Sequence, residues 1–160
     1  MARVRSLRRS AHSLNSVEAA ARSTSATILP LNARTPQDIE NAFSQMARQQ
    51  AGALIVTRDS FLNPQVRQIA EVAAKNRLPT IAGLREYVDA GGLMRYGSSL
   101  SEQYRRAATY VDQILKGAKP GDLPVEQPTK FELIINGRTA KTLGLEIPQS
   151  LLISVDKVID

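Results

Sequence analysis

Apolar residues along this chain alternate between two spacings, short strand-like runs and helical repeats, almost from one end to the other. Runs at residues 27–31, 53–56, 78–82, 93–96 and 131–135 predict strands, and helical spacing predicts helices between them. The run 53–56 is continuously apolar, as a central parallel strand requires, and Pro30 suits an edge strand. This order is typical of βαβ units. The sequence therefore predicts an α/β fold, with a mostly parallel sheet flanked by helices.

Residues that favour helix ends mark several of the predicted helices. Thr35 and Asn63 each stand directly before a proline, which fits the first turn of a helix that a side chain caps. Asn136 is placed to cap a short helix near the C-terminal end. The longest helix is predicted over about 100–116, with one apolar face and with Gly117 at its left-handed end.

Positive charge is concentrated at the beginning of the chain. The 160 residues carry a formal net charge of +6, and four arginines stand within the first ten residues with no acid among them. We therefore expect residues 1–12 to be a basic disordered tail and residues 13–160 to form the α/β lobe. Aromatic residues make up only 4% of the chain, so nucleic-acid binding is not expected beyond weak, salt-dependent association through the tail. No transmembrane segment is expected, because no long apolar run is present.

Residues for catalysis or for metal and cofactor binding are sparse. The chain has no cysteine and one histidine, His12, which lies in the polar beginning of the chain. Phosphate-binding glycine loops and nucleophile elbows are absent. Gly97-Ser98-Ser99 instead predicts a helix entry with a hydroxyl cap. We expect a non-enzymatic protein without a metal or cofactor.

Polar and aromatic residues follow three of the predicted strands. Ligands of open α/β folds bind beyond the carboxyl ends of parallel strands, so these residues are the candidate site. Such a set suits a small zwitterion: a carboxylate pairs with an ammonium group, donors meet a carboxylate, and rings cover an apolar side chain. The candidate ligand-binding residues are Asp59, Ser60, Phe61, Asn63, Arg85, Tyr96 and Gly97.

Several long segments resemble one known family. The segments 91–97, 104–112, 114–136 and 139–145 are similar to the substrate-binding proteins of ABC transporters in the TrpX-like family. The resemblance runs from about Ser16 to the C-terminus.

This resemblance implies the C-terminal lobe of a type I periplasmic-binding-protein-like receptor. Such a receptor binds a small solute, for example an amino acid, and delivers it to an ABC permease. The family's cleft loops fall at residues 59–63, near Arg85 and at Tyr96-Gly97, and residues 98–160 include segments that pack on an N-terminal lobe in the family. A periplasmic location is implied by the resemblance. No export signal is visible, which would make the chain as written cytoplasmic.

This chain also departs from the family's pattern. Relatives are about twice as long, and the strand that opens the second lobe is not evident here, which predicts an open sheet edge and self-association as a homodimer. Arg95 stands where relatives commonly have a small residue, beside the presumed cleft. Two hypotheses stay open at this point: a solute-binding lobe, or a truncated, non-catalytic paralogue that acts as a self-associating interaction domain.

Overall fold

The computed structural model describes residues 2–8, 12–24 and 26–160. Within these residues seven strands form one sheet in the order β2-β1-β3-β4-β5-β6-β7, and only the β5–β6 pair is antiparallel. The strands are β1 (Ala2–Arg8), β2 (Ala26–Asn32), β3 (Ala53–Val56), β4 (Thr80–Ala82), β5 (Met94–Ser98), β6 (Phe131–Asn136) and β7 (Lys157–Ile159). The helices are α1 (His12–Ala21), α2 (Pro36–Arg48), α3 (Val66–Lys75), α4 (Arg85–Asp89), α5 (Leu100–Leu115), α6 (Gly137–Leu143) and α7 (Gln149–Leu152). The predicted α/β fold is confirmed, with β2 at an edge and β3 inside the sheet.

Strand β1 corrects the expectation of a disordered tail over residues 1–12. Its backbone pairs in parallel with β2 on one side and with β3 on the other, so it is a central strand and residue 12 already begins α1. The expectation that the opening strand is missing was therefore wrong as well. The expectation of disorder rested on the positive charge of this segment. The backbone hydrogen bonds of β1 to its two neighbouring strands favour an ordered strand in spite of that charge. Residues 9–11 lie outside the described residues.

The main core lies between one face of the sheet and helices α2, α3 and α4. Helix α2 contributes Ile39, Phe43 and Met46, which stand at helical spacing in the sequence, and all three side chains are buried. They belong to one cluster with Leu54 and Val56 of β3. Because β2 and β3 lie on opposite sides of β1, right-handed crossovers put α1 on the other face of the sheet.

Two of the predicted helix starts are confirmed and one is wrong. The Thr35 side chain accepts a hydrogen bond from the Asp38 N–H (3.2 Å), and Asn136 accepts one from the Thr139 N–H (2.9 Å). Asn63 caps no helix, because a 3₁₀ turn, η1 (Asn63–Gln65), precedes α3 and the Asn63 side chain accepts from the Asp59 N–H. The left-handed Gly117 after α5 is confirmed by its φ of 101°.

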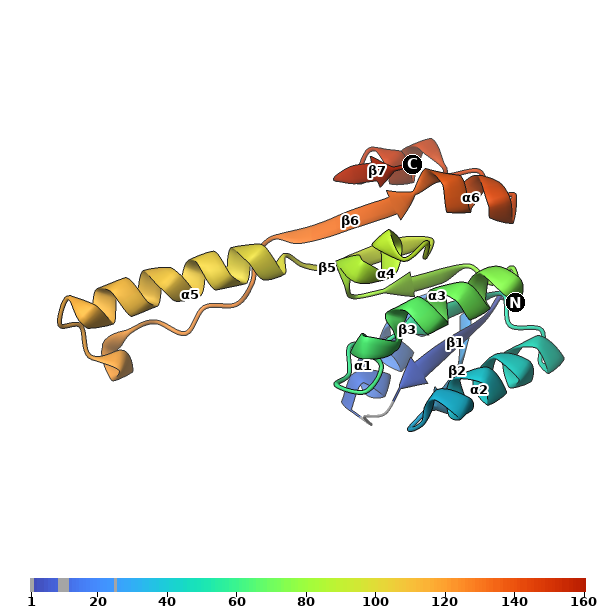
Figure 1. Cartoon of the computed structure of the whole chain (residues 1–160), viewed down its shortest axis with the longest axis horizontal. Coiled ribbons are helices and arrows are strands. Elements are labelled where there is room, and N and C mark those ends of the chain that lie inside the picture. Colours follow the sequence, from blue (N-terminus) through green and yellow to red (C-terminus); the bar gives the residue numbers. More distant parts are fainter. Residues whose placement is uncertain (1, 9–11, 25) are drawn as a thin grey trace.

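Helix α5 projects from the sheet as an arm. Figure 1 shows it extending beyond the carboxyl ends of β4 and β5, with residues 118–130 returning beside it to β6. The predicted apolar face of α5 is present, but none of the helix is buried, and Leu115 is 82% exposed. The arm therefore lies outside the core that stabilises the rest of the chain.

Candidate functional site

A hollow of about 210 Å³ lies where β3, β4 and β5 end and α5 begins. It stands at the sheet edge where open α/β folds bind their ligands. Its lining comprises Arg58, Gly83, Leu84, Arg85, Glu86, Arg95, Ser98, Ser99, Leu100, Ser101 and Glu132. Guanidinium, carboxylate and hydroxyl groups thus surround a short apolar patch, a mixture suited to a small polar solute.

Two glycines let the strand ends approach each other beside this hollow. A Cβ on Gly97 would lie 2.8 Å from the carbonyl oxygen of Gly83, which no side chain tolerates. A Cβ on Gly83 would lie 2.6 Å from Cγ of Arg58, so the aliphatic stem of Arg58 crosses directly over Gly83. The two glycines therefore bring three strand ends together and hold the Arg58 guanidinium at the hollow.

The hollow has one cation and one anion that the rest of the described chain leaves unpaired. The side chains of Arg58 and Glu86 make no hydrogen bond or ion pair within the residues that the structure describes. Arg85 has a partner in Asp89 (3.6 Å), in an exposed pair that contributes little to stability. Unpaired charges of both signs remain for a ligand.

Arg95 forms the buried wall of the hollow. Only 3% of the residue is exposed; its Nη1 donates to Glu132 Oε2 (2.8 Å) and its Nη2 donates to the Ser98 carbonyl oxygen (2.6 Å). Because β6 runs antiparallel to β5, Glu132 lies beside Arg95 on the same face of the sheet. Arg95 therefore places a bulky side chain at this hollow, as expected, and Glu132 on β6 neutralises its charge.

The loop 59–63 bonds mostly to itself. The Phe61 N–H donates to Asp59 Oδ1 (2.8 Å), the Asp59 N–H donates to Asn63 Oδ1 (3.3 Å), and the Phe61 ring packs on the main core. Ser60 is exposed. None of these four side chains lines the hollow.

Tyr96 and Gly97 meet different surroundings on β5. Tyr96 is 55% exposed and stacks on Phe131, with ring centroids 5.8 Å apart. Successive side chains of a strand point to opposite faces, so the Tyr96 ring faces away from Arg95. Of the seven residues predicted from the sequence, Arg85 lines the hollow and Gly97 shapes it through its contact with Gly83.

The remaining lining residues were not selected from the sequence, for two reasons. Arg58, Glu86 and Ser98 stand in the strand-end segments but carry no local mark that separates them from their neighbours. Glu132 joins the site only through the antiparallel β5–β6 pairing, which places it opposite Gly97. Gly97 and Glu132 are 35 residues apart in sequence, so their pairing is tertiary information, which a local pattern does not contain.

The entry to α5 differs in detail from the predicted hydroxyl cap. Ser99 is the N-cap residue, but its hydroxyl hydrogen-bonds the Ser101 hydroxyl (3.0 Å) and accepts nothing from the backbone of the first turn. The Ser98 hydroxyl accepts from Gln103 Nε2 (2.7 Å). The first backbone N–H groups of α5 are therefore left without a side-chain cap at the edge of the hollow.

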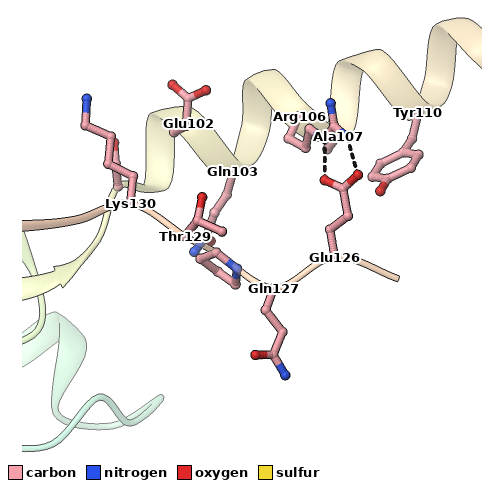
Figure 2. Close-up of a pocket in the computed structure, with 11 residues that line it drawn as sticks. Glu102, Gln103, Arg106, Ala107, Tyr110, Glu126, Gln127, Thr129 and Lys130 are labelled. Carbon is pink, nitrogen blue, oxygen red and sulfur yellow. Dashed lines mark hydrogen bonds and ion pairs between the residues drawn. The ribbon is translucent and has the colours of Figure 1, made fainter. Parts of the chain in front are cut away.

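A larger hollow, of about 560 Å³, lies between α5 and the returning segment and shares Ser99 with the first. Figure 2 shows Glu126 reaching Arg106 across this hollow. Arg106 donates from Nε to Glu126 Oε2 (2.6 Å) and from Nη2 to Glu126 Oε1. The Tyr110 hydroxyl donates to the Pro124 carbonyl oxygen (2.8 Å). The hydrogen bonds between Arg106 and Glu126 lower the pKa of Glu126 and raise the pKa of Arg106. The charges of Arg106 and Glu126 thus pair with each other and join α5 to the returning segment, whereas the strand-end hollow contains the unpaired side chains of Arg58 and Glu86.

Neither a membrane span nor a metal cluster is found in the described part of the chain. No helix there is long and apolar enough to cross a bilayer, and no group of three or more metal-ligating His, Cys, Asp or Glu side chains occurs there.

An open, mostly parallel sheet, a polar hollow at its strand ends and a projecting arm define the class of this protein: a periplasmic-binding-protein-like α/β lobe. A model of the ABC transporter substrate binding protein family matches residues 6–159. The chain belongs to that family, as the resemblance of its segments implied.

One curated protein and two solved structures are similar to this chain. A tyrosine-binding protein of Clostridioides difficile is 27% identical over 112 residues, which are 70% of this chain and 32% of that protein. The structure of an ABC domain in complex with L-Trp from Streptococcus pneumoniae has a TM-score of 0.85 at 24% identity, and covers 99% of this chain and 56% of that one. A conserved domain protein from Vibrio cholerae has a TM-score of 0.86 at 21% identity, with 98% and 54% covered. The chain thus spans a third to about half of the length of these relatives.

Proposed function

We propose that this chain binds a small solute at the carboxyl ends of β3, β4 and β5, as the solute-receiving lobe of an ABC-type substrate-binding protein. The observation that carries the proposal is the strand-end hollow with Arg58 and Glu86 unpaired. Family membership supports it, and the tyrosine-binding relative and the L-Trp complex favour an amino acid as the first class of solute. The role is binding without chemical conversion.

The groups of the hollow divide between the two ends of an amino acid. Arg58 and Arg85 suit its carboxylate, Glu86 suits its ammonium group, and Leu84 and Leu100 offer apolar contact. A ligand longer than the hollow would extend toward the loop 59–63, so Asp59, Ser60, Phe61 and Asn63 stay in the proposed site. Tyr96 stays in it as a ring at the same sheet edge, and Gly97 as the residue that keeps the strand ends close.

A thermal-shift screen of the full chain against the twenty amino acids tests the proposal. Selective binding to the folded state raises the melting temperature, by an amount that grows with ligand concentration over Kd. Arg58→Gln should remove the increase, and Arg67→Gln, which changes an exposed arginine on α3, should keep it. A folded sample that responds to no amino acid at millimolar concentration would show that the chain does not act as such a receptor.

Delivery to a permease outside the cytoplasm is part of the same proposal. A substrate-binding protein works by passing its solute to membrane partners, so the chain should fractionate with the extracytoplasmic proteins of its cell. It should also co-purify with an ABC permease in the presence of solute. Recovery of the protein only from the cytoplasm would contradict this part of the proposal.

Self-association is a second candidate, favoured by the arm. Tyr104, Val111 and Leu115 of α5 are large, apolar and exposed, and exposed apolar patches commonly mark interfaces. Strand β1 is present between β2 and β3, so no edge is left open by a missing opening strand, and the exposed face of α5 is the better surface for a second copy of this chain. In sedimentation velocity, a dimer should form at high concentration and dissociate in Leu115→Glu. A concentration-independent monomer would remove this candidate.

A further inference from the structure

The Arg95 side chain has an unsatisfied donor in the wall of the strand-end hollow. Its Nη1 and Nη2 bond to Glu132 and to the Ser98 carbonyl, but its Nε, which is closed off from solvent, has no hydrogen-bond partner among the described residues. Buried donors are nearly always paired with protein, water or ligand, so we expect at this Nε an acceptor that the described residues do not supply, either a water molecule or a group of the solute.

Beside Arg95, the N-terminus of α5 opens onto the same hollow. Ser99 and Ser101, whose hydroxyls bond each other, both line it, and no side chain caps the first turn of this 16-residue helix. Uncapped N–H groups and the positive end of the helix dipole together favour an anion.

Unpaired positive charge comes from the opposite wall, since the charge of Arg95 is neutralised by Glu132. The Arg58 stem lies over Gly83, and its guanidinium lines the hollow without a partner in the described chain. Glu132 and Arg95 neutralise each other, and the unpaired Glu86 of the same hollow is the group assigned above to the ammonium end of an amino acid. Three donor groups from β5, α5 and the loop after β3 thus surround one small volume.

The size of the hollow indicates which part of a solute it takes. Its volume is about 210 Å³. Pockets that enclose a whole drug-sized ligand occupy roughly 300–1,000 Å³. The hollow therefore fits a charged headgroup, while the rest of the solute lies outside it.

We propose that this hollow is an oxyanion subsite: the N-terminal N–H groups of α5, with Arg58 and Arg95, hold a carboxylate or phosphate group of the solute. The inference rests on the proposed function, since it names the part of the solute that this lobe recognises. It makes Arg95 a specificity-determining residue that selects solutes with an exposed oxyanion over their neutral amides.

Calorimetric titration of the full chain with succinate, inorganic phosphate and succinamide tests the subsite. Succinate, phosphate or both should bind saturably, and their relative affinities distinguish a carboxylate site from a phosphate site. Neutral succinamide should not bind. Arg58→Gln should weaken anion binding about tenfold, as expected for the loss of one charge-assisted hydrogen bond.

A carboxylate introduced in the first turn of α5 tests whether the anion binds at the start of this helix. Ser101→Asp introduces a carboxylate in the first turn of α5, where it favours the helix and competes with a bound anion. This variant should stay folded and lose anion binding by at least about tenfold, whereas Ser44→Asp, the same change on an exposed position of α2, should bind as the wild type does. The double variant Arg95→Met with Glu132→Met removes both buried charges without leaving one unpaired, and should also weaken binding.

The outcomes separate this inference from the proposed function. Unchanged anion affinity in Ser101→Asp overturns the subsite. So does an amino acid that raises the melting temperature as much in its amide form as in its free acid, and in that case the proposed function stands. Anion binding that follows the variants as described supports the subsite even if no amino acid binds, a result that would overturn only the proposed function.

Discussion

Tyr87 and Gly92 form a contact that only glycine permits. The Tyr87 ring is 1% exposed, and a Cβ on Gly92 would lie 2.1 Å from Cε1 of that ring. The ring lies in the main core beside α3 and β4, so it has little room to move. The Tyr87 ring can occupy this position only because residue 92 has no side chain.

Gly92→Ala should therefore destabilise the fold by about 1–3 kcal/mol, the usual cost of overpacking a core. Urea denaturation measures it. Gly121→Ala is the matched control, because a Cβ on Gly121 meets no atom within 4 Å. Equal free energies of unfolding for the two variants would contradict the contact.

Burial also gives Tyr87 a measurable pH dependence. It raises the pKa of the phenol to about 12, against an ordinary value of about 10. Between these two values the unfolded chain has lost the proton and the folded chain keeps it, so stability falls as the pH rises. The loss should reach roughly 2–3 kcal/mol across the window, at about 1.4 kcal/mol per pH unit.

Tyr87→Phe should flatten this decline in urea denaturation at pH 8, 10 and 11.5. Tyr104→Phe, which changes an exposed tyrosine on α5, should leave the decline as it is. A wild-type slope in the Tyr87 variant would show that another group causes the loss.

At the scale of elements, the start of α2 is held by a reciprocal pair of hydrogen bonds. The Thr35 side chain accepts from the Asp38 N–H, and Asp38 Oδ2 accepts from the Thr35 N–H (3.0 Å). Backbone hydrogen bonds from Arg34 and Thr35 lower the pKa of Asp38, so its contribution is present above the unfolded pKa and is lost as the pH falls through the lowered value.

Thr35→Ala should cost about 1 kcal/mol of unfolding free energy, the usual value for a lost N-cap. Ser44→Ala, at an exposed interior position of the same helix, should change stability by no more than a few tenths of that, since no cap is removed. Denaturation curves of the two variants that superimpose would contradict the capping role.

Local sequence was sufficient to predict elements whose signals are themselves local. Thr35, Asn136 and the apolar stripe of α2 act within one or two turns, and the structure confirms each of them. Strand β1 and the pairing of Arg95 with Glu132 were missed because they depend on partners far along the chain. In the candidate site, the sequence predicts the strand-end edge, whereas strand register decides which side chains face the hollow there.

At the scale of the whole molecule, β1 joins the two halves of the sheet. It pairs with β2 over residues 2–8 and with β3 over residues 4–7, so its backbone groups are used on both sides. A proline within such a strand removes a ladder hydrogen bond and is tolerated poorly away from edges.

Arg5→Pro should lower the free energy of unfolding by about 1–3 kcal/mol. Arg5→Thr is the control, because it removes the same charge but keeps the backbone N–H donor. It should retain a cooperative transition near that of the wild type. Thermal unfolding followed by circular dichroism compares them. If both variants unfold as the wild type does, residues 2–8 are not a central strand.

The central claim is that this chain holds a small solute at the carboxyl ends of β3, β4 and β5. Its most direct test is nuclear magnetic resonance mapping of backbone amides during titration with the amino acid that most raises the melting temperature. We predict saturable shifts that cluster at residues 83–86 and 98–101. Shifts that cluster instead along residues 106–127 of the arm, or no shifts at all, would contradict the claim.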